Sequence, residues 1–128
     1  MRVANELLTE GFEQMRRSER LAYGCPLLFS AREVVPTFGF TFNISEGGLF
    51  VRTLTPPPMG TALELKFTPP FGRGQVWVEG NVAWRSMQRV NPRGVPSGFG
   101  LSYGELPVAD GAALAAGYAE LLANKGGV

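Results

Sequence analysis

Between residues 21 and 103, prolines and glycines divide the chain into short stretches in which apolar and polar side chains alternate. The chain holds 17 glycines and 10 prolines, and turn signals recur roughly every eight to fifteen residues. Alternation with a period of two is typical of a strand with one buried face. Because six strands left as an open sheet would expose two edges, the sequence predicts a mainly all-β fold, a small six-stranded antiparallel barrel. The strands are expected at residues 21–30, 38–42, 49–54, 62–67, 76–84 and 99–103.

The alternation also predicts which side chains face the barrel interior. Phe38, Phe40 and Phe42 alternate with Gly39 and Thr41. Large aromatic side chains dominate the energetics of most cores. We therefore expect this aromatic stripe to lie in the core.

The longest expected strand carries both tryptophans. Val76, Val78, Val82 and Trp84 are expected on one face of this strand, and Trp77 falls on the other face. Successive side chains of a regular strand point to opposite faces. At least one tryptophan is therefore expected in the core, and the other is exposed or lines a site.

The two ends of the chain differ from the barrel region. Residues 1–15 have apolar side chains at roughly helical spacing and are expected to form a short helix or an arm. Residues 107–128 are expected to form a C-terminal helix and tail, with an apolar stripe at Leu114, Tyr118, Leu121 and Leu122. The barrel domain is therefore expected to span residues 16–106, in a chain long enough for one modest core.

Two short runs carry most of the functional information. The first, residues 16–20, reads Arg-Arg-Ser-Glu-Arg and places guanidinium groups at Arg16 and Arg20. The second, residues 43–48, reads Asn-Ile-Ser-Glu-Gly-Gly and is expected to form a tight turn between two strands. Guanidinium groups suit phosphate oxygens and the acceptor edge of guanine. A glycine-rich turn exposes backbone N–H groups that can hold an anion.

The composition argues against several classes of function. The chain has no histidine, which excludes Ser-His and Cys-His nucleophiles and removes the commonest general base, so an enzyme is not expected. No metal site or cofactor is expected either, because zinc sites need clustered Cys and His. The single cysteine, Cys25, cannot form an intrachain disulfide, which favours a cytoplasmic protein. No apolar run approaches the length of a membrane span or a secretory signal.

The small net charge conceals an asymmetry along the chain. Residues 16–104 hold ten basic and five acidic residues, whereas the two flanks together hold two basic and six acidic residues. A modestly basic middle fits a compact anion such as a dinucleotide. A nucleic acid is not expected as a partner, because it would call for a broad basic face.

The two runs together resemble the paired signature of the PilZ family, which is RxxxR followed by (D/N)xSxxG. Between the two runs lie 22 residues, 21–42, and the resemblance covers roughly residues 14–106. Val82-Ala83-Trp84 looks like the late strand of the family, and residues 98–101 look like its closing GxG strand. The resemblance implies a PilZ-type barrel with a terminal helix and a function as a receptor for the bacterial second messenger cyclic di-GMP.

The resemblance also implies roles for individual residues. Arg16 and Arg20 would bind guanine bases and phosphates, with Arg17 as an auxiliary cation. Asn43 and Ser45 would hydrogen-bond guanine. The remaining expected ligand-binding residues are Gly47, which shapes the turn, Gly48, which permits close approach of the backbone, and Trp84, which packs against a base.

Three classes of function remain open on the sequence. A cyclic di-GMP receptor is favoured, in which the ligand orders the N-terminal arm and creates a surface for a downstream protein partner. The alternative is a PilZ-like protein–protein adaptor that binds no nucleotide, and a small nucleic-acid-binding barrel is a minor third. The oligomeric state is left open, with a homodimer possible through the apolar C-terminal stripe.

Overall fold

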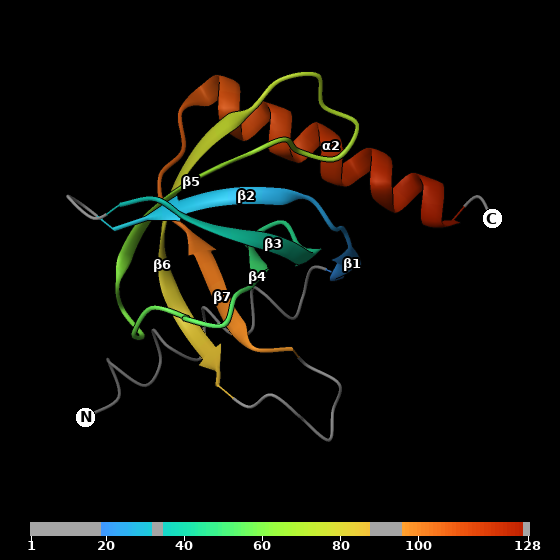
Figure 1. Cartoon of the computed structure of the whole chain (residues 1–128). Coiled ribbons are helices and arrows are strands. Elements are labelled where there is room, and N and C mark those ends of the chain that lie inside the picture. The colour runs from blue at the N-terminus through green and yellow to red at the C-terminus, as the bar shows by residue number, and fades with distance from the viewer. Residues whose placement is uncertain (1–18, 32–34, 88–95, 127–128) are drawn as a thin grey trace, which may run out of the picture.

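The computed structural model describes residues 19–31, 35–87 and 96–126. These residues form seven strands and one helix around a single core (Figure 1). The N-terminal arm expected at residues 1–15 lies outside the described residues. The elements are β1 (Leu21–Ala22), β2 (Pro26–Ser30), β3 (Thr37–Ile44), β4 (Gly48–Arg52), β5 (Ala62–Phe67), β6 (Val76–Ser86), β7 (Gly98–Tyr103) and α2 (Val108–Gly126).

Six of the strands close into an antiparallel barrel. Strands β3, β2, β5, β6, β7 and β4 follow one another around it, and β4 pairs back with β3. The short strand β1 is an additional strand beside β3. The closed six-stranded barrel predicted from the alternation and from the resemblance is therefore confirmed, and closure leaves the six barrel strands without a free edge.

The expected strand at residues 21–30 is divided into β1 and β2 by a bend. Thr41 of β3 holds this bend from inside the barrel, because its hydroxyl donates to the Tyr23 carbonyl at 2.5 Å and accepts from the Cys25 N–H at 2.7 Å. These bonds satisfy backbone groups that leave the regular ladder between the two strands. The bend is what lets residue 20 lie beside the end of β3 while β2 continues along the start of the same strand.

The barrel interior is filled by aliphatic and phenylalanine side chains from every barrel strand. Phe29 and Phe99 meet edge to face at its centre, with ring centroids 5.2 Å apart. The other interior side chains include Leu27, Leu49, Val51, Leu63, Leu65, Phe67, Val76, Val78, Val82 and Leu101. Their positions alternate along the strands as the sequence pattern predicts.

The predicted C-terminal helix is confirmed as α2, which lies along one side of the barrel with its C-terminal end toward β1 (Figure 1). Leu114 and Tyr118 of this helix are buried in the same core cluster as the strands. Gly117 allows close packing, because an added Cβ there would lie 2.6 Å from the carbonyl oxygen of Pro70. Among the described residues, no helix has the length and apolar character of a bilayer-crossing segment.

The aromatic stripe of β3 is the clearest difference from expectation. Phe38, Phe40 and Phe42 were expected in the core, but their side chains are 72%, 54% and 39% exposed. The interior positions of this strand belong to Gly39 and Thr41 instead. Thr41 faces inward because it bonds the bend, and a Cβ on Gly39 would meet Val51 and the Arg52 carbonyl across the strand. The expectation was wrong because aromatic size was given more weight than the space available inside a small barrel.

Candidate functional site

A row of directly paired residues crosses four barrel strands on the outer face. Asn43 of β3 pairs with Phe50 of β4, Phe50 pairs with Gly100 of β7, and Gly100 pairs with Trp84 of β6. Directly paired residues point to the same side of a sheet. The inward neighbours of this row, such as Leu49 and Leu101, belong to the core, so the row itself lies outside.

Two β-bulges place the ends of this row on the outer face. The register between β3 and β4 shifts between Thr41 and Asn43, and the register between β6 and β7 shifts between Val82 and Trp84. A bulge adds one unpaired residue and so reverses the direction of the side chains that follow it. Val82 therefore faces the core whereas Trp84 faces outward.

This bulge corrects the expectation for the two tryptophans. The strict alternation placed Trp84 with Val82 on the core face and Trp77 on the opposite face. In the structure Trp84 is half-buried and paired with Gly100, on the side away from the core, whereas Trp77 is exposed. Both tryptophans are therefore on the outer face of β6, Trp77 through regular alternation and Trp84 because Ala83 is an extra residue between it and Val82.

Trp84 packs on an aromatic surface formed by Phe50 and Phe42, which we call the aromatic floor. Its ring centroid is 5.0 Å from that of Phe50, and Phe42 meets Phe50 edge to face at 5.9 Å. Phe50 is only 1% exposed although it lies outside the barrel core. The indole also crosses directly over Gly100, where any Cβ would collide with it. The Trp84 Nε1 atom is buried there, and none of the described residues is its hydrogen-bond partner.

The side chain of Arg20, in the first motif, lies over the Trp84 ring. Its guanidinium carbon lies 5.6 Å from the Trp84 ring centroid, a cation–π distance. The two motifs are adjacent in the fold because β1 starts directly after Arg20, and its residues Leu21 and Ala22 pair with Ile44 and Asn43. Arg20, Asn43 and Trp84 are therefore brought to one side of the barrel. Arg16 and Arg17 lie outside the described residues.

The turn of the second motif is held by its own hydrogen bonds. The Ser45 side chain is buried, and both its N–H and its hydroxyl donate to the Gly48 carbonyl, at 2.8 and 3.2 Å. A Cβ at Gly48 would collide with the Leu101 carbonyl of β7, so glycine is required there by strand packing. A Cβ at Gly47 would meet nothing within 4 Å. The motif thus fixes the shape of the turn, and Gly47 adds no side chain to it.

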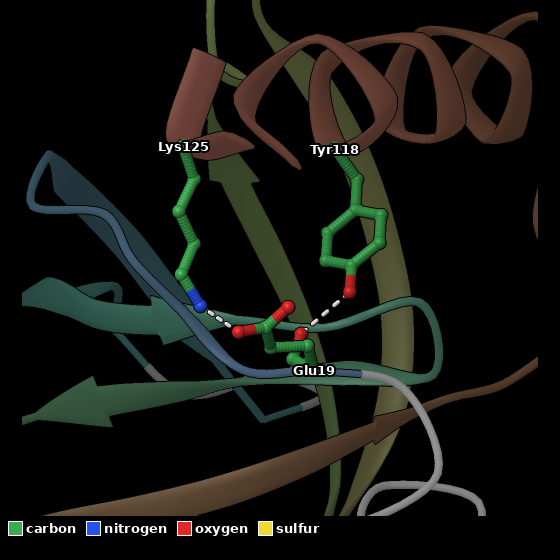
Figure 2. Close-up of polar contacts among 3 residues, drawn as sticks. All are labelled: Glu19, Tyr118 and Lys125. Carbon is green, nitrogen blue, oxygen red and sulfur yellow. Dashed lines mark hydrogen bonds and ion pairs between the residues drawn. The ribbon is translucent and has the colours of Figure 1, made fainter. Parts of the chain in front are cut away.

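Helix α2 contacts the first motif at the residue before Arg20. The Tyr118 hydroxyl donates to the Glu19 carbonyl at 2.5 Å, and Lys125 forms an ion pair with the Glu19 carboxylate (Figure 2). Burial raises the pKa of Tyr118, and the nearby carboxylate of Glu46, from the second motif, adds to the rise. One tyrosine of the helix therefore lies beside both motifs.

Several of these residues were missed in the sequence analysis. Phe50 could have been found, because Leu49, Phe50 and Val51 form a continuous apolar run, which indicates burial on both faces of the strand. Gly100 was noted only as part of a GxG strand. Nothing in the sequence pairs Tyr118 or Lys125 with Glu19, which they contact from the far end of the chain.

The arrangement combines a flat aromatic surface, a guanidinium group and a side-chain amide. A guanidinium can stack on a ring and donate several hydrogen bonds in one plane, and an amide both donates and accepts. This set suits a planar, anionic, heteroaromatic ligand. No group of His, Cys, Asp and Glu suited to a metal ion occurs within the three described stretches of the chain.

Comparison with known proteins identifies the family and the fold. The family model of the PilZ domain matches residues 14–120. The fold is similar to the solved structure of the Bacillus subtilis inhibitor of motility (MotI/DgrA), with a TM-score of 0.69 at 22% identity over 88% of this chain and 53% of that chain. This chain therefore spans about half of that protein, and the likeness concerns the fold. No curated protein matches the sequence. Since the family model covers most of the chain, the chain belongs to the PilZ domain family.

Proposed function

We propose that this protein is a cyclic di-GMP receptor and adaptor. The observation that carries the proposal is the position of Arg20 over Trp84, which lies at the opposite end of the same row of paired residues from Asn43. PilZ domains are binding and adaptor domains, so a receptor is the function that the family supports best, and we propose that it acts in the cytoplasm.

Each group of the site has a counterpart in the ligand. Cyclic di-GMP offers flat guanine rings, whose N7 and O6 atoms accept hydrogen bonds, and two phosphates. The Arg20 guanidinium would bind guanine or phosphate while Trp84 and Phe50 support it from below. A bidentate Arg–guanine contact provides about 1–3 kcal/mol of discrimination against the wrong base. Asn43, as a neutral amide, would hydrogen-bond a guanine edge.

The turn residues have a supporting role in this proposal. Ser45 and Gly48 keep the turn closed through the bonds already made to the Gly48 carbonyl, and Gly47 adds no side chain between the turn and the ligand. A direct contact of the Ser45 hydroxyl with guanine stays a prediction, as do the roles of Arg16 and Arg17. We further propose that the bound ligand orders the N-terminal arm and that the ordered arm contacts a downstream protein.

Calorimetric titration with cyclic di-GMP tests the proposal, with GTP and cyclic AMP as control ligands. Arg20→Ala should weaken binding at least tenfold, a loss of about 1.4 kcal/mol, because the planar donor fork disappears. Arg73→Ala is the matched control. Arg73 is an exposed arginine in the loop before β6, at the opposite end of that strand from Trp84, and its removal should leave the Kd unchanged.

Two results would contradict the proposal. Absence of heat or saturation with cyclic di-GMP at high micromolar concentration would leave the protein as an adaptor without nucleotide. Equal losses in Arg20→Ala and Arg73→Ala would mean that overall positive charge, and not a specific guanidinium site, attracts the ligand.

A further inference from the structure

Helix α2 is attached to the arginine motif by two polar contacts. The Tyr118 hydroxyl donates to the Glu19 carbonyl at 2.5 Å, and Lys125 pairs with the Glu19 carboxylate (Figure 2). The two contacts differ in environment, because Tyr118 is buried in the core whereas the Lys125 and Glu19 side chains are 57% and 48% exposed. Half-exposed ion pairs contribute little, so the tyrosine bond is the stronger of the two contacts.

The bond to Tyr118 acts directly on the backbone of Arg20. The carbonyl of Glu19 and the N–H of Arg20 belong to the same peptide group, which is planar. Fixing the carbonyl therefore fixes the plane from which the Arg20 side chain departs. On the other side of Arg20, Leu21 is held by pairing with Ile44. The Arg20 backbone is thus held from both sides, once by the helix and once by the sheet.

The same face of the helix also lies against the second motif. Ile44, Ser45 and Glu46 line a cavity of about 370 Å³ together with Tyr118 and neighbouring helix residues. The position of α2 is therefore defined relative to the turn as well as to Glu19. Because Tyr118 is itself anchored in the core, its hydroxyl is a fixed reference point between the two halves of the site.

We propose that Tyr118 and Lys125 are positioning residues of the ligand site, which act through Glu19 to hold the Arg20 guanidinium over Trp84. This inference rests on the proposed function. It follows that ligand binding and helix docking stabilise each other, since coupling between two binding events is reciprocal. Ligand should accordingly increase the protection of the α2 amides against hydrogen exchange.

The experiment uses the full chain in a Trp77→Phe background, where Trp84 is the only tryptophan. Tyr118→Phe removes one hydroxyl and should raise the Kd for cyclic di-GMP about fivefold, as expected for loss of one positioning hydrogen bond. Lys125→Ala should raise the Kd about twofold, and Lys125→Arg, which keeps the positive charge, should have the Kd of the parent.

Tyr23→Phe is the matched control for a purely structural effect. Tyr23 donates to the Thr68 carbonyl, also at 2.5 Å, so the same substitution removes an equivalent bond without touching Glu19. Both tyrosine variants should lower the urea midpoint to a similar extent. Only Tyr118→Phe should raise the Kd, and equal Kd values in the two variants would overturn the inference.

A second readout needs no ligand. The fluorescence emission of Trp84 should change in Arg20→Ala, because the cation over the ring is lost. In Tyr118→Phe it should change in the same direction but by a smaller amount. If the parent protein fails to bind cyclic di-GMP, the proposed function fails and the inference is judged by this emission alone. An emission spectrum that is unaltered by Tyr118→Phe, or by Arg20→Ala itself, would overturn the inference independently.

Discussion

The two tryptophans of β6 both contact a cation, but the residues that hold the two rings in place differ. Both lie on the outer face of the strand, and each has a cation over its ring, Lys66 at 5.1 Å from Trp77 and Arg20 at 5.6 Å from Trp84. Trp77 is 55% exposed and pairs directly with Lys66 on β5. Trp84 follows a bulge, lies on Phe50 and Gly100, and receives its cation from a segment far away in the sequence.

The difference shows what separates a surface contact from a constructed site. Cation–π pairs occur roughly once per 70–80 residues in protein structures, so the pair alone has little meaning. At Trp77, regular pairing of β5 with β6 is sufficient to explain why Lys66 lies over the ring. At Trp84, a bulge, a glycine and a buried phenylalanine on three strands are all needed to hold the ring where Arg20 meets it. That convergence is why we propose a ligand site at Trp84.

Truncation of the two tryptophans is the strongest test of this comparison. Trp84→Ala should lower the free energy of unfolding by about 3 kcal/mol, the low end of the range for a buried aromatic, because Trp84 is half-buried and its removal uncovers Phe50 and Gly100. It should also weaken cyclic di-GMP binding at least tenfold, a loss of about 1.4 kcal/mol. Trp77→Ala should change stability by about 0.5 kcal/mol or less and leave the Kd unaltered. Urea unfolding and calorimetry measure the two effects.

Trp84→Phe keeps the binding test informative if Trp84→Ala folds poorly. The Trp84 Nε1 atom forms no hydrogen bond with the part of the chain that the structure describes, so phenylalanine loses ring area but no hydrogen bond to these residues. Its Kd should lie between those of the parent and the alanine variant. A Trp77→Ala protein that loses as much affinity as Trp84→Ala would show that the two tryptophans are equivalent and that the proposed location is wrong.

A single methyl group at Gly100 should have the next largest effect. Alanine in a strand is ordinarily preferred to glycine by about 0.5–1 kcal/mol. Here the new Cβ would collide with the rigid indole of Trp84, and overpacking of this kind costs about 1–3 kcal/mol. Gly100→Ala should therefore lower the urea midpoint and weaken ligand binding together, because Trp84 must leave the floor.

Gly74→Ala is the matched control for the Gly100 substitution. An added Cβ at Gly74 would meet nothing within 4 Å, and its backbone has no strained conformation. This variant should be as stable as the parent or up to about 1 kcal/mol more stable. If Gly100→Ala behaved in the same way, Trp84 would not be held over β7 as described.

The fold could be predicted from the sequence wherever strands are regular. The alternation along β5 and the start of β6 gave the correct inward faces, and the apolar stripe with Tyr118 gave the C-terminal helix. The prediction was wrong at Phe38, Phe40, Phe42 and Trp84. A bulge reverses the direction of side chains without a signature of its own in a single sequence. The space inside a closed barrel is likewise a property of several strands together.

The candidate site was predictable only in part, for a related reason. The paired motifs gave Arg20 and Asn43, which do lie near each other. The turn motif was interpreted as a contact for ligand, which stays a prediction. The structure adds that a Cβ at Gly48 would collide with the neighbouring strand and that Ser45 bonds within the turn. Contacts between Tyr118 and Glu19 depend on how the helix packs against the barrel. Local patterns therefore identified the groups that offer chemistry but not those that hold them in place.

Removal of Lys66, the cation over Trp77, should have the smallest effect. It tests whether the cation at Trp77 differs from the cation at Trp84 in its contribution to binding. Lys66→Ala deletes the charge over Trp77, and an exposed cation–π pair contributes about 0.5–1 kcal/mol, so the free energy of unfolding should fall by about 0.5 kcal/mol. The Kd for cyclic di-GMP should not change, because the Lys66–Trp77 pair is formed between β5 and β6 alone. Titrations of Lys66→Ala and Arg20→Ala with cyclic di-GMP at two salt concentrations measure the two Kd values.

A loss of affinity in Lys66→Ala that disappears at high salt would mean that ligand is attracted by charge spread over the whole outer face. Salt screens distant exposed charges and acts much less on a direct contact.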